Sequence, residues 1–200
     1  QGTLLVMNCT FSGNSAAAGG AILSSGGTLT IQSSTFSDNT ATDNNGGALS
    51  ISGGTASIST STFSANKSAT QSGGAIAMMD AVLTIVNSTF ASNSAVYTGG
   101  GINAIQDTGT NTLTLVNSTF SGNIATDPTA FGGGIYNSNG SLHFKITILA
   151  NGNSAGDCSS TNGLAEDVNN IIEGDGCRST TYPIDPLLGP LANNGGPTQT

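Results

Sequence analysis

Hydrophobic and polar positions alternate along short stretches of this chain, and the same stretch returns at regular intervals. Before a recurring Phe, apolar residues lie seven and five positions upstream with Thr or Ser between them, as in Leu29–Phe36 and Leu113–Phe120. Alternation with a period of two predicts β-strands that bury one face. No window carries a helical apolar stripe. A second alternating stretch follows each glycine pair and begins with an inward apolar residue: Ile22, Leu49, Ile76, Ile102 and Ile135.

Two residue types mark the repeats. The Phe positions are Phe11, Phe36, Phe63, Phe90 and Phe120, and each has an Asn three residues later, namely Asn14, Asn39, Asn66, Asn93 and Asn123. Ile148 with Asn151 is a degenerate sixth copy. A spacing of about 27 residues is typical of a solenoid, in which one supersecondary unit stacks on the next.

Stacked parallel strands place equivalent residues above one another at about 4.8 Å. The Phe residues then form one internal ladder, and the Ile and Leu positions form further ones. The Asn amides can bond from coil to coil, and Asn tolerates the left-handed backbone that a corner needs. The glycine pairs mark another corner, where φ is positive or backbones approach closely. With three strand-like pieces per coil and a right-handed crossover, the sequence predicts an all-β, right-handed parallel β-helix of about six coils.

The repeats are expected to occupy residues 1–151, and residues 152–200 to form a C-terminal loop and an extended tail. The tail cannot form a coil of its own because it carries four prolines, which remove backbone donors: Pro183, Pro186, Pro190 and Pro197. We therefore expect the tail to pack along its own β-helix or on a neighbour.

The chain has three cysteines. Cys158 and Cys177 bracket the irregular segment after the last coil, and a disulfide between them would stabilise a loop that has little core of its own by about 3 kcal/mol. We interpret Cys9 as a small buried residue, with an intermolecular disulfide as the alternative. Its position corresponds to a serine in the later coils: Ser34, Ser61, Ser88 and Ser118.

Charge and hydropathy exclude several classes of partner. The chain carries 11 acidic and 3 basic residues, for a net charge of −8. With only Lys67, Lys145 and Arg178 there is no basic patch, so we expect no binding to nucleic acid. No apolar run reaches the roughly 18–20 residues of a membrane span, so we expect no membrane insertion. The chain opens inside a repeat strand with no signal peptide, which suggests a processed chain or a fragment. Few lysines, abundant Ser and Thr, and paired cysteines favour an extracellular or cell-surface location.

The Gly-Gly-Ala-Ile and Phe-x-x-Asn phrases resemble the repeat pair of the chlamydial polymorphic outer-membrane proteins. The same pair runs through many bacterial right-handed parallel β-helix proteins, and here it covers residues 1–151. The rest is similar to the tail of the choice-of-anchor Q surface proteins, which often carry a CSLREA segment. The resemblance implies a secreted or cell-surface protein of an adhesive or structural kind. The matching phrases of the tail are Asp157-Cys158, Asn170-Ile171-Ile172, Cys177 and Asp185–Thr200.

Catalysis on polysaccharides would need clustered carboxylates, often with Ca²⁺. The only histidine, His143, points outward beside Lys145. We therefore expect no catalytic residues, no enzyme activity and no cofactor. Ca²⁺ bound at Gly174–Gly176, or at Glu166 and Asp167, is the alternative. The acidic residues are scattered, mostly at corners: Asp38, Asp43, Asp80, Asp107 and Asp127.

Two surface features could face a ligand. The longer corners Gln106–Asn111 and Thr126–Phe131, near Tyr97 and Tyr136, are the expected ligand-facing loops. An outward threonine ladder is either a set of ordinary solvent-facing strand residues or an array that orders water, as in ice binding. Its members are Thr10, Thr35, Thr62, Thr89 and Thr119.

The first coil shows no cap in the sequence: no helix, no charged cluster and no proline. An open β-helix end pairs with other chains, and a head-to-tail contact that does not close gives a filament. We therefore expect a non-enzymatic extracellular structural protein that assembles end to end with its own copies into a filament, sheath or surface layer. A cell-surface adhesin or glycan-binding β-helix is the first alternative, with surface glycans as partners. A polysaccharide lyase-like or hydrolase-like enzyme is the second.

Overall fold

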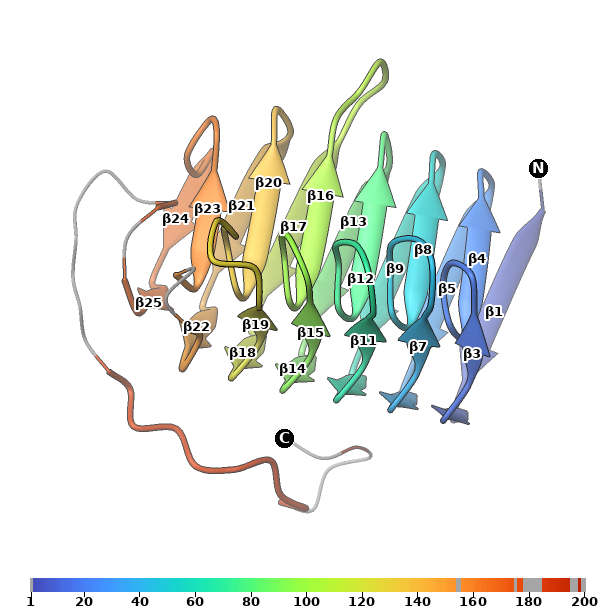
Figure 1. Cartoon of the computed structure of the whole chain (residues 1–200), viewed down its shortest axis with the longest axis horizontal. Coiled ribbons are helices and arrows are strands. Elements are labelled where there is room, and N and C mark those ends of the chain that lie inside the picture. The colour runs from blue at the N-terminus through green and yellow to red at the C-terminus, as the bar shows by residue number, and fades with distance from the viewer. Residues whose placement is uncertain (1, 154–155, 175, 178–184, 195–197, 199–200) are drawn as a thin grey trace.

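The computed structural model describes residues 2–153, 156–174, 176–177, 185–194 and 198, and these form a parallel β-helix of about six coils (Figure 1). Neighbouring strands in each sheet come from neighbouring coils. The described residues contain no helix. The predicted β-solenoid is therefore confirmed.

Four parallel sheets run along the solenoid, and we name them A to D in the order in which the chain visits them. Sheet A contains β1 (Thr3–Met7), β5 (Thr28–Gln32), β9 (Thr55–Ser59), β13 (Val82–Val86), β17 (Thr112–Val116), β21 (Ser141–Lys145) and β24 (Glu166–Val168). Sheet B contains β2 (Thr10–Ser12), β6 (Thr35–Ser37), β10 (Thr62–Ser64), β14 (Thr89–Ala91), β18 (Thr119–Ser121), β22 (Ile148–Ala150) and β25 (Ile171–Ile172).

Sheets C and D complete each turn. Sheet C contains β3 (Ser15–Ala16), β7 (Thr40–Ala41), β11 (Lys67–Ser68), β15 (Ser94–Ala95) and β19 (Ile124–Ala125). Sheet D contains β4 (Ile22–Ser25), β8 (Leu49–Ser52), β12 (Ile76–Met79), β16 (Ile102–Ile105), β20 (Ile135–Ser138) and β23 (Cys158–Ser160). The prediction of three strand-like pieces per coil was wrong, because the two-residue strands of sheet C are too short to show an alternating pattern.

The core consists of internal ladders, one from each inward strand position. The Phe rings of sheet B stack in register, with adjacent centroids 4.5–4.8 Å apart and interplanar angles of 2–5°. Phe11 in the first coil is half-buried, and the four later rings are buried. Inward residues of the other sheets, such as Leu83 of sheet A and Ile76 of sheet D, close the same core. Each stacked pair adds about 0.5–1.5 kcal/mol to the effect of burial.

The Asn residues of the repeats form a hydrogen-bonded ladder beside the Phe stack. Nδ2 of Asn39 donates to Oδ1 of Asn66 at 2.9 Å and to the carbonyl of Phe11 in the preceding coil at 3.0 Å. The same Oδ1 of Asn66 accepts the backbone N–H of Asn39 at 3.1 Å. The pattern runs from Asn14 to Asn123. Because both amide atoms have partners, these side chains can be buried at little cost.

The corner beside this ladder takes a left-handed backbone one residue earlier than predicted. The backbone N–H and the side-chain amide of each ladder Asn are hydrogen-bonded to the next coil. The residue before the Asn therefore makes the turn. A positive φ of 54–65° is therefore found before each ladder Asn, at Gly13, Asp38, Ala65, Ser92 and Gly122.

The two positions of the glycine pair require glycine for different reasons. Gly46 has a φ of 80°, in the region that favours glycine. Gly47 lies against the next coil, where a Cβ would collide with the carbonyl oxygen of Gly74 and with the backbone of Lys67. The pair thus lets neighbouring coils approach closely at this corner.

Strand pairing continues beyond residue 151, where we expected the repeats to end, since β23, β24 and β25 extend sheets D, A and B. In the sixth coil Leu149, and not Ile148, pairs with Phe120 and fills the buried Phe position. Asn151 is exposed at the left-handed corner, with a φ of 60°, and is not part of the Asn ladder. The degenerate copy lacks both marker residues, so spacing alone misplaces its register by one residue.

Cys9 is exposed, so its interpretation as a buried residue was wrong. In later coils the equivalent Ser34 and Ser61 are buried between two neighbours. The N–H of Cys9 donates to Oγ of Ser34 at 3.2 Å, which is the contact with the following coil. In the described chain no coil precedes Cys9, and nothing there covers its thiol.

Candidate assembly and binding surfaces

At the N-terminal end, the strands of the first coil pair on one side only. Strands β1 to β4 are the end strands of the four sheets in the described chain. Leu4, Leu5 and Met7 expose apolar surface at this edge. Residues 1–37 contain no charged side chain. A long, apolar and uncharged edge is one that pairs readily with another strand.

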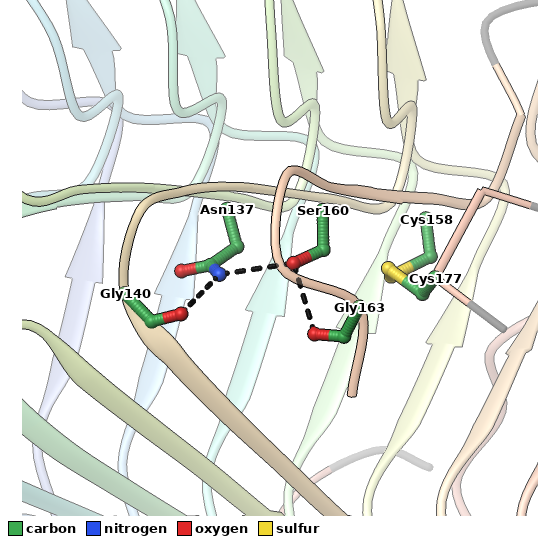
Figure 2. The surroundings of a disulfide bond; sticks show 6 residues. All are labelled: Asn137, Gly140, Cys158, Ser160, Gly163 and Cys177. Atoms are coloured by element: carbon green, nitrogen blue, oxygen red, sulfur yellow. Dashed lines mark hydrogen bonds between the residues drawn. A yellow bond between two sulfur atoms is a disulfide. The ribbon is translucent and has the colours of Figure 1, made fainter. Parts of the chain in front are cut away.

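The C-terminal end is closed over sheet D by the predicted disulfide (Figure 2). Cys158 lies on β23, in the position that Ile135 holds one coil earlier. The Cα atoms of Cys158 and Cys177 are 5.5 Å apart, and both residues are buried. The N–H of Ser160 donates to the carbonyl of Gly176 at 3.0 Å. The segment that carries Cys177 therefore covers β23 much as a further coil would.

A chain of polar contacts joins this cap to the fifth coil (Figure 2). Nδ2 of Asn137 donates to the carbonyl of Gly140 at 2.8 Å and to Oγ of Ser160 at 3.1 Å. Oγ of Ser160 donates to the carbonyl of Gly163 at 3.0 Å. Among the described residues, Oδ1 of Asn137 and the amide of Asn111 are buried without a hydrogen-bond partner. This polar cluster, which the sequence analysis missed, continues one inward ladder of sheet D, that of Ile51, Met78 and Ala104, with polar side chains.

Asp157 is a buried carboxylate next to the disulfide. Burial raises the pKa of its carboxyl to about 6; the N–H of Gly152, which donates to Oδ1 at 2.8 Å, opposes this rise, and the charge of Glu173 adds to it. Glu173 in turn accepts the N–H of Asn151 at 2.7 Å. The cap therefore contains a group that titrates within the ordinary working range of pH.

The outer face of sheet B carries the predicted threonine ladder, but the tail covers part of it. Thr89 and Ala91 point outward from β14, yet only 6% of each is exposed. Figure 1 shows the tail (red) running back along the solenoid. A regular, fully exposed threonine array, as ice binding would need, is therefore not present over β14. A half-open cavity of about 530 Å³ lies between the tail residues Leu188–Ala192 and Asn194 and the sheet residues Thr89, Ala91, Ser92, Thr119, Ser121 and Gly122.

One of the longer corners presents aromatic side chains. Tyr97 and Phe131 are exposed on adjacent coils, which are joined here by a parallel bridge between Thr98 and Phe131. Tyr136 is half-buried. Two aromatic rings are thus exposed on neighbouring coils at the corner Thr126–Phe131.

Carboxylates hold the two longer corners in place. Asp80 accepts the N–H of Asp107 at 2.9 Å and that of Thr108 at 3.2 Å, and the bond from Asp107 above all lowers the pKa of Asp80. Asp127 accepts the hydroxyl of Thr129 at 2.6 Å and its N–H at 2.8 Å, which lowers the pKa of Asp127. Both carboxylates therefore stabilise the turns that surround them.

Ionic contacts gather where β21 meets β24. Nζ of Lys145 lies 3.0 Å from Oε1 of Glu166, and Nδ1 of His143 lies 3.7 Å from Oε2. Among the described residues no group of three or more His, Cys, Asp and Glu side chains is placed to hold a metal ion. Asp175, in the centre of one candidate Ca²⁺ segment, lies outside the described residues. A search of the described chain for a helix of sufficient length and apolarity to cross a membrane finds none.

Two family models match the chain. The model described as the right handed beta helix region matches residues 1–114. The Chlamydia polymorphic membrane protein repeat matches residues 117–138, which indicates the context of an outer-membrane or surface protein. Neither the curated proteins nor the solved structures include a match. With more than half of its length matched, the chain belongs to the right-handed β-helix family.

Proposed function

We propose that this chain is a non-enzymatic extracellular structural protein whose copies stack end to end into a filament, sheath or surface layer. The open edges of sheets A and B carry this proposal. In the described chain, β1 and β2 are end strands on one side, and β24 and β25 are end strands on the other. A second copy placed in line would continue both sheets with parallel pairing. Such a head-to-tail contact does not close on itself, so it propagates.

The chemistry of the two ends supports this assembly. Phe11 stacks on Phe36 on the side of the second coil, which leaves its other face toward the open end. At the opposite end Val168 and Ile171 expose apolar surface on β24 and β25. Residues 1–37 bring no charge to the contact, so Glu166 and Asp167 on β24 of one copy would meet an uncharged edge of the next copy and no like charge.

The test is electron microscopy of the purified chain together with light scattering over a dilution series. We expect filaments in the wild type and discrete particles in the variant Leu4→Lys, which places a charge at an inward position of the edge strand. Leu23→Lys is the matched control, because Leu23 is exposed on β4 of the same coil. A wild-type chain that stays monomeric at all concentrations would refute end-to-end stacking.

A second candidate function is glycan binding at the lateral surface, favoured by the exposed Tyr97 and Phe131 on adjacent coils. Aromatic faces present large apolar surfaces with specific geometry. A glycan array probed with the wild type and with Tyr97→Ala/Phe131→Ala decides the matter. Binding that disappears in the double variant would support this candidate, and an empty array would remove it.

A further inference from the structure

We propose that the outer face of sheet B is a docking groove for an extended proline–leucine segment, filled here by residues 185–194 of the same chain, and that a second copy of the chain can supply this segment in exchange. Exchange would link two solenoids through their lateral faces. It is independent of end-to-end stacking, which uses the edges of the sheets.

The groove is a stripe of small outward side chains. Strands β2, β6, β10, β14 and β18 of sheet B alternate an inward Phe with an outward Thr and a small residue, as in Thr89–Ala91 and Thr119–Ser121. Small side chains leave a trough along the solenoid axis, into which a backbone can approach closely. The burial of Thr89 and Ala91 to 6% exposure shows that the trough is filled at β14. The equivalent Thr35 and Ser37 on β6 are only half-buried.

The burial and the local turn of residues 185–194 suit a segment that lies in such a trough. Leu188 and Leu191 are half-buried and line the cavity that faces the sheet, whereas Leu187 is 83% exposed. The N–H of Leu187 donates to Oδ1 of Asp185 at 2.7 Å, and Leu187 has a φ of 51°. This local turn sets which leucines face the sheet. The two prolines of the segment carry no N–H, so the segment needs no strand partner at these positions.

The contact can be broken without breaking the solenoid. A cavity of about 530 Å³ remains between the segment and the sheet, so the fit is looser than a close-packed core. The segment adds no strand to any of the four sheets. Seven residues, 178–184, join it to Cys177 and hence to the cap. Loss of this contact therefore leaves the strand pairing of every coil in place.

A second copy fits this groove because both surfaces are uncharged. Residues 186–194 and the outward side chains of β14 and β18 include no charged residue, although the chain as a whole carries −8. Two copies therefore meet here with little electrostatic repulsion. A tethered segment has an effective concentration on the order of millimolar. Exchange is therefore expected where copies are crowded to that level, as in an array on a surface.

The test mixes two full-length variants with complementary defects. A tail variant carries Leu188→Asp and Leu191→Asp, which leaves its groove empty. A face variant carries Ala91→Asp and Ser121→Asp, which leaves its tail undocked. Both also carry Leu4→Lys to suppress end-to-end stacking. In neither variant can the tail dock on the groove of its own chain. The contact between the two variants therefore does not compete with an internal one, as it does in the wild type.

Sedimentation at about 100 µM, well below the effective concentration of a tethered segment, should show monomers for each variant alone and a one-to-one heterodimer for the mixture. The control moves the face substitutions to outward positions of sheet A, Thr30→Asp and Ser57→Asp; this variant should keep its own tail docked and form no heterodimer. A mixture that remains monomeric, or a tail variant that dimerises alone, would overturn the proposal. Thermal melts show whether each variant is folded.

A second measurement covers the case in which the face variant does not fold. A fluorescently labelled peptide of residues 185–194 is titrated into the folded tail variant, and its anisotropy is recorded. We expect saturable binding to the tail variant that the unlabelled peptide competes away. Binding to the wild type should be at least roughly tenfold weaker, because its own tail occupies the groove. Absence of binding to the tail variant would overturn the proposal.

Discussion

The middle coils and the C-terminal end of the solenoid are stabilised by different kinds of contact. In the middle, each ladder residue meets its equivalents in two neighbouring coils, and the ring of Phe63 has a stacked ring at 4.7 Å on each side. At the C-terminal end the contacts occur once each. They are the disulfide between Cys158 and Cys177, the buried carboxylate of Asp157 and the ionic contacts of Glu166.

The difference follows from the number of neighbours that a coil has. A ladder Asn donates to the coils on both sides and accepts from the preceding one, so its bonds are complete only between two neighbours. Residues that do not repeat replace these bonds at the C-terminal end. The first coil keeps the repeat residues instead, with Phe11 half-buried and Cys9 exposed. Changes in the middle should therefore destabilise the whole solenoid, whereas changes at the C-terminal end should loosen the cap.

The largest effect is expected from Phe63→Ala in the middle. The substitution removes two ring stacks and leaves a cavity in a buried ladder. We expect the free energy of unfolding to fall by about 3–5 kcal/mol. Urea denaturation measures this loss, and hydrogen exchange should show faster opening in the coils on both sides.

Phe131→Ala is the matched control, since this Phe is exposed at a corner. It should change the free energy of unfolding by no more than about 0.5 kcal/mol. Equal losses for the two variants would contradict the view that the internal ladder, rather than aromatic content, stabilises the middle coils.

The interior of the fold could be predicted because its residues have the same surroundings in every coil. Phe36, Phe63 and Phe90 recur with one spacing, and that spacing is enough to place them in one ladder. The register of the sixth coil could not be predicted in this way. Leu149 and the neighbouring Ile148 are similarly apolar, and only the pairing with β18 decides which of them is buried.

The surfaces were less predictable than the core. The disulfide could be inferred from the two cysteines that bracket the last segment, but Asn137 gave no signal, because an isolated Asn in a strand is usually solvent-facing. The position of the tail was also hidden. Leu188 lines a cavity opposite small residues that are indistinguishable in the sequence from ordinary outward strand residues.

Removing the disulfide should have the next largest effect, and a local one. Cys158→Ser with Cys177→Ser frees a segment with a sequence separation of 19, for an expected loss of about 3 kcal/mol. Hydrogen exchange should rise in β23, β24 and β25 and stay unchanged in β9 and β13. Cys9→Ser is the control, because its thiol is free and exposed. Uniformly faster exchange along the solenoid would contradict an independent cap.

A smaller effect, dependent on pH, is expected from Asp157. Its pKa is about 6 in the folded chain and about 3.9 in an unfolded one. The folded state thus holds the proton more tightly, so the contribution of this group is complete below about pH 4 and is lost as the pH rises to 6. With allowance for solvent screening, we expect a loss of about 2 kcal/mol.

Asp157→Asn should abolish this part of the pH dependence, because the amide is neutral and its oxygen can still accept the N–H of Gly152. Chemical denaturation from pH 4 to pH 7 measures it as the difference between variant and wild type. Asp43→Asn, at an exposed carboxylate, is the control. Parallel stability profiles for wild type and Asp157→Asn would show that this carboxyl does not titrate between pH 4 and pH 6.

The smallest effect is expected from Lys145→Met, which removes the 3.0 Å ion pair with Glu166 between β21 and β24. The side chains are 44% and 37% exposed, so water screens the pair and its loss should cost no more than about 1 kcal/mol. The difference from wild type should shrink toward zero in about 1 M salt. Lys67→Met on β11 is the control for loss of a positive charge elsewhere. A loss of several kcal/mol that salt does not alter would mean that the Lys145 stem packs as part of the core, and the contrast between a repeating interior and a separately bonded end would then fail at this coil.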